Sequence, residues 1–135
     1  MAKIKHLAIK TRDPNELASF YENTLGLEVV LRRETGAVYM SDGYLSLALL
    51  PMREGDKNEG LDHFGFAIDD LQDVADKLTA EGVMAPKVRP NNPPFAETRA
   101  IDPHGNEFDL SVHGFDRVEY QEDRAEKKEK IPEPV

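Results

Sequence analysis

Two histidines and one aspartate stand out in this sequence as side chains that could bind a metal ion together. His6 lies in "IKHLAIK" and His63 in "LDHFGFA", and both segments alternate as half-buried strands do. Asp109 lies in "EFDLS", between Phe108 and Leu110. Its carboxylate must face water, a cation or hydrogen-bond donors, because an unpaired buried charge is too costly. Two imidazoles and one carboxylate are the set that holds non-haem iron(II) and leaves coordination positions open.

The two histidines occupy equivalent positions in an internal repeat. The segments "IKHLAIKTRDPNELASFYENTLGLEVV" and "LDHFGFAIDDLQDVADKLTAEGVMAPKV" share one plan of strand, acidic cap, helix, glycine and strand. Asp13 and Asp70 are predicted to cap the two helices, and Gly26 and Gly82 to end them. An offset of 57 residues relates the copies and also relates the two histidines.

The second halves of the two copies also match. "VYMSDGYLSLALL" and "TRAIDPHGNEFDLSV" each predict a hairpin around a glycine-containing turn. Each copy is therefore expected to be a βαβββ module. Superposing Gly43 on Gly105 places Leu47 at the position of Asp109, which predicts an aliphatic residue opposite the carboxylate.

Length and composition limit the function classes. A chain of 135 residues with 39% hydrophobic and 32% charged residues is typical of one soluble globular domain. The net charge of −9 argues against a nucleic-acid partner. The absence of cysteine excludes disulfides and thiolate metal sites. We expect no membrane association and a cytoplasmic location, because no signal peptide or membrane-spanning stretch is evident.

The segments outside the repeat are polar. We expect one domain over residues 1–115, with module one at about 1–50, module two at about 61–115 and a linker at 51–60. The proline-rich segment 89–97 could rim a pocket. Residues 116–135 form a charged tail, expected to be a fraying helix or a disordered end rather than an arm that braces a dimer.

Four further polar residues have weaker claims to a site. His104 lies in a turn and is expected to be exposed. His113 has the strand parity of Asp109, so it could line the pocket or support a metal ligand from behind, or simply end the strand. Tyr44 and Arg99 lie in the hairpins and could face a substrate.

With these motifs the chain resembles the vicinal oxygen chelate superfamily, which includes glyoxalase I, bleomycin and fosfomycin resistance proteins and extradiol dioxygenases. The carrying segments are "HLAIKTRDPNELASFYENTLGLEVV", "LDHFGFAIDDL" and "DPHGNEFDLSVHG". The resemblance implies an α+β fold in which two tandem βαβββ modules form a curved mixed-sheet cup, usually in a homodimer. It also implies that His6, His63 and Asp109 bind a divalent metal ion, with Fe(II) as the first choice and Mn(II) or Zn(II) as alternatives.

The chain departs from the family pattern in two ways. The last-strand acid is usually glutamate in the family, whereas this chain has the shorter Asp109. Glyoxalase I and the related epimerases have a polar ligand or base at the position that Leu47 is expected to occupy in this chain. A leucine can neither move a proton nor bind a cation.

These departures order the functions that the resemblance allows. The best match is an extradiol-type ring-cleaving dioxygenase, which needs iron(II) with open adjacent positions and binds a small substrate through two oxygens. A glyoxalase-like lyase or isomerase and a fosfomycin-type transferase remain alternatives. A metal-free protein that sequesters a drug, as bleomycin resistance proteins do, is an alternative of another class.

Overall fold

A computed structural model describes residues 1–89 and 98–112 of the chain. These residues form two helices and eight strands, which follow the order strand, helix, three strands twice. The bounds in module one are β1 (Lys3–Thr11), α1 (Pro14–Leu25), β2 (Glu28–Arg32), β3 (Val38–Ser41) and β4 (Ser46–Pro51). Those in module two are β5 (Gly60–Ala67), α2 (Leu71–Ala80), β6 (Lys87–Val88), β7 (Thr98–Ile101) and β8 (Glu107–Ser111).

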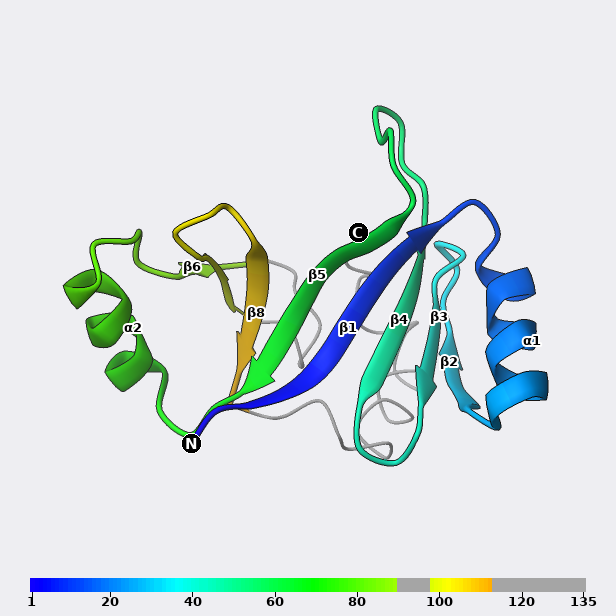
Figure 1. The fold of residues 1–135 in the computed structure, drawn as a ribbon, viewed down its shortest axis with the longest axis horizontal. Helices are drawn as coiled ribbons and strands as arrows, with labels where there is room; N and C mark the ends of the chain where they lie inside the picture. Colours follow the sequence, from blue (N-terminus) through cyan, green and yellow to red (C-terminus); the bar gives the residue numbers. More distant parts are fainter. Residues whose placement is uncertain (90–97, 113–135) are drawn as a thin grey trace.

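All eight strands belong to one open, curved sheet in the order β2-β3-β4-β1-β5-β8-β7-β6. The two modules meet where β1 pairs antiparallel with β5, and each of these strands pairs in parallel with the last strand of its own module. The central strands cross the middle of the molecule, and the helices lie at its two ends (Figure 1). The predicted α+β class with two βαβββ modules in a mixed sheet is confirmed.

Both helices begin at the predicted aspartates. Asp13 accepts a hydrogen bond from the backbone N–H of Glu16, and Asp70 accepts one from that of Asp73. Gly26 ends α1 at a φ of 76°, a left-handed conformation that glycine adopts without steric cost. The caps fix where each helix starts and therefore which of its sides packs on the sheet.

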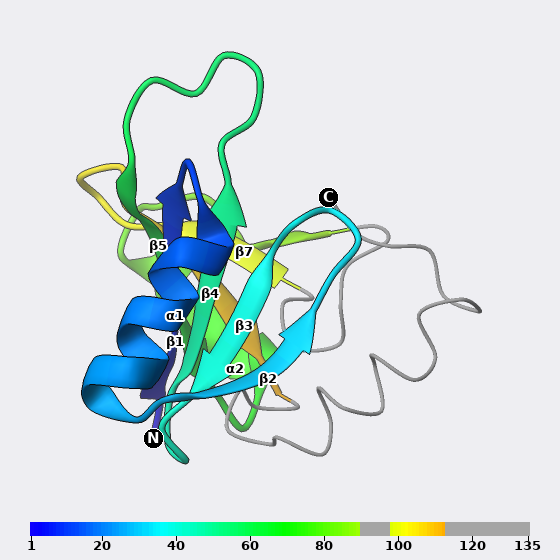
Figure 2. The ribbon, with the colours of Figure 1, turned by 90° about the vertical axis from the view of Figure 1, so that its right-hand side faces the viewer.

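Each helix covers one face of the sheet at its own end. Ala18 of α1 packs with Val38, Met40 and Leu49, and Leu71 and Val74 of α2 pack against the cluster of Phe108 and Leu110. Seen from the side, α1 lies against one face of the sheet (Figure 2). Along each strand, the alternate side chains point to the other face of the sheet, away from the helices.

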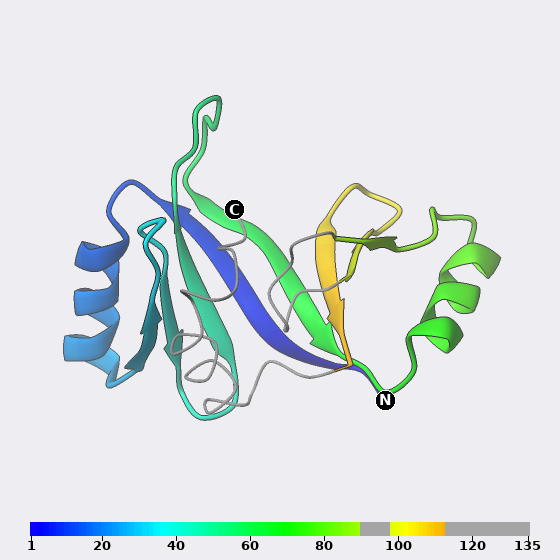
Figure 3. The ribbon, with the colours of Figure 1, turned by 180° about the vertical axis from the view of Figure 1, so that it is seen from behind.

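That second face is hollowed into a cavity of about 600 Å³. Small residues, Ala8 and Ala48, lie side by side on the central strands and leave room above the sheet. The view from behind shows β1 and β5 running between the two ends of the molecule (Figure 3). Within the described ranges, neither helix is long and apolar enough to cross a membrane.

Candidate metal centre

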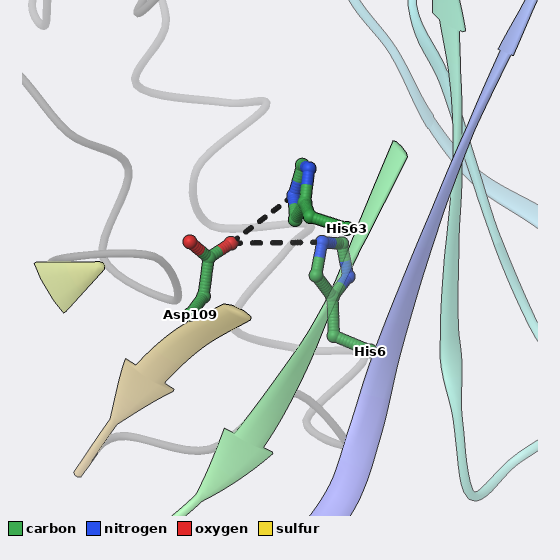
Figure 4. A group of neighbouring side chains, drawn as sticks. All are labelled: His6, His63 and Asp109. Carbon is green, nitrogen blue, oxygen red and sulfur yellow. Dashed lines mark ion pairs between the residues drawn. The ribbon is translucent and has the colours of Figure 1, made fainter. Parts of the chain in front are cut away.

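Three adjacent strands bring His6, His63 and Asp109 to one point. His6 lies on β1, His63 on β5 and Asp109 on β8, and β5 pairs with both of the other strands. The Asp109 carboxylate points toward both imidazole rings (Figure 4). Its Oδ2 lies 3.2 Å from His63 Nε2 and 4.0 Å from His6 Nε2. One chain therefore supplies the whole group.

All three side chains are buried. Asp109 is 0% exposed, His6 3% and His63 8%, although all three border the cavity. Phe108 and Leu110 point instead into the core under α2. The alternation of the strand thus places the carboxylate among polar partners on the cavity side.

Arg99 fixes the orientation of the Asp109 carboxylate. The two residues are paired across β7 and β8, and Arg99 Nε donates a 2.8 Å hydrogen bond to Asp109 Oδ1. An Nη atom of Arg89 lies 3.8 Å from the same oxygen. Oδ1 is therefore held by guanidinium groups, while Oδ2 is turned toward the histidines and makes no hydrogen bond of standard geometry within the described residues.

Asp62 fixes the orientation of the His63 ring. Strand β5 has a β-bulge where it pairs with β1: Ala8 pairs with His63 and the next residue, Ile9, pairs with Leu61. Asp62, between His63 and Leu61, is therefore the extra residue of the bulge. Asp62 Oδ2 lies 2.7 Å from His63 Nδ1. Burial raises the pKa of Asp62, but the contacts with His63 and Lys10 outweigh it and lower that pKa. The Asp62 carboxylate therefore accepts the hydrogen bond that the N–H at His63 Nδ1 donates. His63 Nε2 then faces Asp109.

The charges at the centre favour a bound cation. Burial, followed by the charge of His63, lowers the pKa of His6 to about 3, so this imidazole is neutral at pH 7. Burial raises the pKa of Asp109, but the interactions with His63 and Arg99 outweigh it and lower that pKa to about 2. His63 Nε2 and the ionised Asp109 Oδ2 lie only 3.2 Å apart, so one cation could contact both atoms.

The donor set fits a divalent metal ion. The three ligand atoms lie within 4.8 Å of one another. An ion with bonds of about 2.1 Å needs its ligand atoms about 3 to 3.5 Å apart, so small rotations of the side chains suffice. The shorter Asp109 reaches both histidines, and its second oxygen is already occupied by Arg99. Monodentate binding through Oδ2 is therefore the arrangement that these residues could provide.

The structure corrects the residue opposite Asp109. Residues that pair on parallel strands face the same side of a sheet. In module one, Ala8 lies two residues after His6 and pairs with Ala48. In module two, Gly65 lies two residues after His63 and pairs with Asp109. The counterpart of Asp109 is therefore Ala48, and the assignment to Leu47 is wrong.

The error has a simple cause in the two turns. Gly43 and Gly105 occupy different places between their paired strands, so superposing them shifts the register by one residue. Leu47 packs on the helix side of the sheet, whereas Ala48 borders the cavity. The position opposite the carboxylate is still apolar, but a methyl group leaves more space there than an isobutyl group.

The other candidate residues have different outcomes. His104 is exposed in its turn, as expected. Tyr44 is 48% exposed and packs over the ammonium group of Lys5, away from the cavity. Arg99 borders the cavity and binds Asp109. His113, the tail at 116–135 and segment 90–97 lie outside the described residues, while Arg89 at the start of the proline-rich segment borders the cavity.

Comparisons with known proteins show the family to which this fold belongs. Residues 3–110 match the family model of the Glyoxalase/Bleomycin resistance protein/Dioxygenase superfamily. A comparison with curated proteins gave no significant match.

Solved structures with the same fold include several enzymes. The 2,3-dioxygenase LapB from Pseudomonas sp. KL28 is 23% identical with a TM-score of 0.65, and the match covers 81% of this chain and 40% of that one. The chain thus spans less than half of this dioxygenase. A methylmalonyl-CoA epimerase from Streptomyces coelicolor is 25% identical with a TM-score of 0.57, covering 83% of this chain and 96% of that one. A superfamily member from Vibrio splendidus 12B01 is 18% identical with a TM-score of 0.58, covering 82% and 97%.

Proposed function

The chain belongs to the Glyoxalase/Bleomycin resistance protein/Dioxygenase superfamily, and we propose that it is a metal-dependent enzyme of that family that binds a small substrate through two oxygen atoms. One observation carries the proposal. His6, His63 and Asp109 converge inside a cavity, and the place where a fourth protein ligand would stand is taken by Ala48. Three protein ligands leave an octahedral ion accessible on its cavity side.

The finer proposal is an extradiol-type ring-cleaving dioxygenase that uses Fe(II). Bound iron(II) would supply a Lewis-acid and redox centre with adjacent positions for the two oxygens of a catechol. The two histidines and one carboxylate are the ligand types for this chemistry. The likeness to LapB supports the fold of such an enzyme.

The residues around the centre have separate tasks in this proposal. Neutral His6 offers a lone pair without first losing a proton at pH 7. Asp62 holds the His63 ring and keeps its proton on Nδ1, and Arg99 holds the Asp109 carboxylate. Ala8 and Ala48 leave space where the substrate would lie. Because these positions are set before binding, little ordering is needed when the substrate arrives.

An epimerase is the second candidate function, and two observations favour it. Asp62 and Glu107 border the cavity, and a carboxylate near a carbon acid can act as its base. The likeness to methylmalonyl-CoA epimerase from Streptomyces coelicolor extends over 96% of that chain. An epimerase moves a proton at carbon and consumes no oxygen.

Metal analysis and two assays separate these functions. The protein is purified without oxygen, its metals are measured, and oxygen uptake with catechol and 3,4-dihydroxybenzoate is recorded. Stoichiometric iron and oxygen uptake with ring opening support the dioxygenase. Exchange of the α-hydrogen of methylmalonyl-CoA with D2O, without oxygen uptake, supports the epimerase. A protein that binds no added Fe(II), Mn(II) or Zn(II) contradicts the metal proposal and favours a binding protein.

A further inference from the structure

The cavity has a charge opposite to that of the whole chain. The chain has a net charge of −9, yet five basic residues border the cavity: Lys10, Arg33, Arg53, Arg89 and Arg99. Among the residues that the structure describes, three acidic ones border it: Asp62, Glu107 and Asp109. A bound divalent ion would make this excess of positive charge larger. A cavity with low-dielectric walls focuses such a field on whatever enters it.

Part of this positive charge is already balanced by nearby acids. Lys10 Nζ lies 2.9 Å from Asp56 and 3.4 Å from Asp62. Arg99 is hydrogen-bonded to Asp109. These two cations therefore have structural partners and are not needed to explain recognition of a ligand.

Arg89 is poorly balanced by comparison. Its closest acid within the described residues is Asp109, at 3.8 Å from an oxygen that already accepts a hydrogen bond from Arg99. Its side chain is 28% exposed, so the guanidinium is partly removed from water. Arg53 and Arg99 border the same cavity as Arg89. Like charges grouped in this way repel one another, and an anion placed among them would remove that cost.

Arg53 reaches the cavity from the linker between the two modules. It lies in the segment between β4 and β5, where its backbone N–H binds Asp56, and its side chain borders the cavity. Asp56 also binds Lys10, which ties this segment to β1. Arg53 and Arg89 thus approach the cavity from two different loops, and Ala8 and Ala48 border the same cavity.

We propose that Arg89 and Arg53 form a subsite for an anionic group, a carboxylate or a phosphate, on the substrate that the metal centre binds. The inference rests on the proposed function and gives its substrate class: a small molecule with two metal-binding oxygens and a separate negative charge. Guanidinium groups suit this task because they bind carboxylate and phosphate oxygens in pairs. Neutral chelators would use the metal centre alone.

Three chelators that differ in one group test the subsite. Zn(II)-loaded protein, which avoids oxidation, is titrated calorimetrically with catechol, 3,4-dihydroxybenzoate and 3,4-dihydroxyphenylphosphonate. We expect the two anionic compounds to bind at least about tenfold more tightly than catechol. The stronger of the two identifies the anion as carboxylate or phosphate. Equal affinity for all three compounds would overturn the subsite while leaving the metal centre intact.

Variants assign the preference to particular side chains. Arg89→Gln and Arg53→Gln should each reduce the preference for the anionic compounds over catechol several-fold, and Arg53→Gln should also leave catechol affinity unchanged. Arg32→Gln, at an exposed site outside the cavity, removes the same charge and should change neither. Zinc content is measured first, and if Arg89→Gln loses zinc, Arg53→Gln decides the result. A preference that survives in Arg53→Gln, or that falls equally in Arg32→Gln, contradicts the subsite. Failure of catechol itself to bind contradicts the proposed function instead.

Discussion

Asp62 is the residue whose role can be tested most directly at the metal centre. Its Oδ2 lies 2.7 Å from His63 Nδ1, on the side of the ring away from Asp109, so in the metal proposal it acts by positioning a ligand. Asp62→Asn should weaken metal binding about 10- to 100-fold, because the ring loses its charged partner and its preferred tautomer. Competition with a fluorescent zinc chelator measures the affinity.

A matched aspartate gives the control for this variant. Asp76 is exposed on α2, where it accepts a hydrogen bond from Gln72. Asp76→Asn makes the same chemical change far from the cavity and should leave zinc affinity as it is. Equal affinities in Asp62→Asn and the wild type would show that His63 needs no support from Asp62.

Burial of His6 predicts a pH dependence of stability in the metal-free protein. The unfolded chain binds a proton on this imidazole below pH 6.5, whereas the folded chain binds it only near pH 3. As far as His6 is concerned, the free energy of unfolding is thus highest above pH 6.5. It falls as the pH is lowered toward 3, by up to about 1.4 kcal/mol per pH unit. Asp109 adds to the loss only below its ordinary pKa of 3.8. Urea unfolding at pH 7, 6 and 5 with EDTA measures the slope.

Replacing the histidine isolates its share of that slope. His6→Gln cannot titrate and should flatten the curve between pH 7 and 5, whereas exposed His104→Gln should leave it unchanged. An unaltered slope in His6→Gln would assign the acid sensitivity to another group.

At the scale of the elements, the register of β4 predicts opposite effects for neighbouring residues. Ala48 borders the cavity and Leu47 packs against the helix-side core, so each can be changed alone. Leu47→Ala should lower the free energy of unfolding by about 2 kcal/mol, with chelator binding unchanged. Ala48→Leu should fill the cavity and weaken catechol binding about tenfold or more, with metal content unchanged. Urea unfolding and calorimetry distinguish the two, and interchanged results would restore the sequence-based register.

The same register shows what the sequence could and could not predict. Asp13 and Asp70 act locally, so the helix starts followed from sequence alone. The convergence of His6 and His63 followed from the repeat, because equivalent strands pair at the junction of the modules. The prediction for Leu47 was wrong because a one-residue difference between turns reverses the face of every later residue in a strand.

The roles of Asp62 and the arginines were beyond the sequence for another reason. Asp62 enters the cavity through a bulge, which breaks the alternation that strand patterns rely on. The hairpin pattern marks Arg99 as a residue that could face a substrate, but its bond to Asp109 depends on the pairing of β7 with β8. Arg89 and Arg53 lie outside the helices and strands, so the periodic patterns of the sequence do not indicate which way their side chains face.

At the scale of the molecule, the pairing of β1 with β5 decides which chain supplies each ligand. This pairing joins the modules of one chain and completes the His6, His63 and Asp109 group within it. In a dimer that exchanged modules, His6 of one chain would instead meet His63 and Asp109 of the other. The two arrangements use the same residues and differ only in connectivity.

Mixing two inactive variants distinguishes these arrangements. His6→Ala and His63→Ala chains should each bind no zinc, and we expect that unfolding and refolding them together restores none, because each chain still lacks one of its own ligands. In an exchanged dimer, the intact His6 of one variant would meet the intact His63 and Asp109 of the other and form one complete site per mixed dimer. Zinc analysis of the refolded mixture, with wild-type chains refolded alongside, measures this. Recovery approaching one zinc per mixed dimer would show that the sheet junction between β1 and β5 forms between chains.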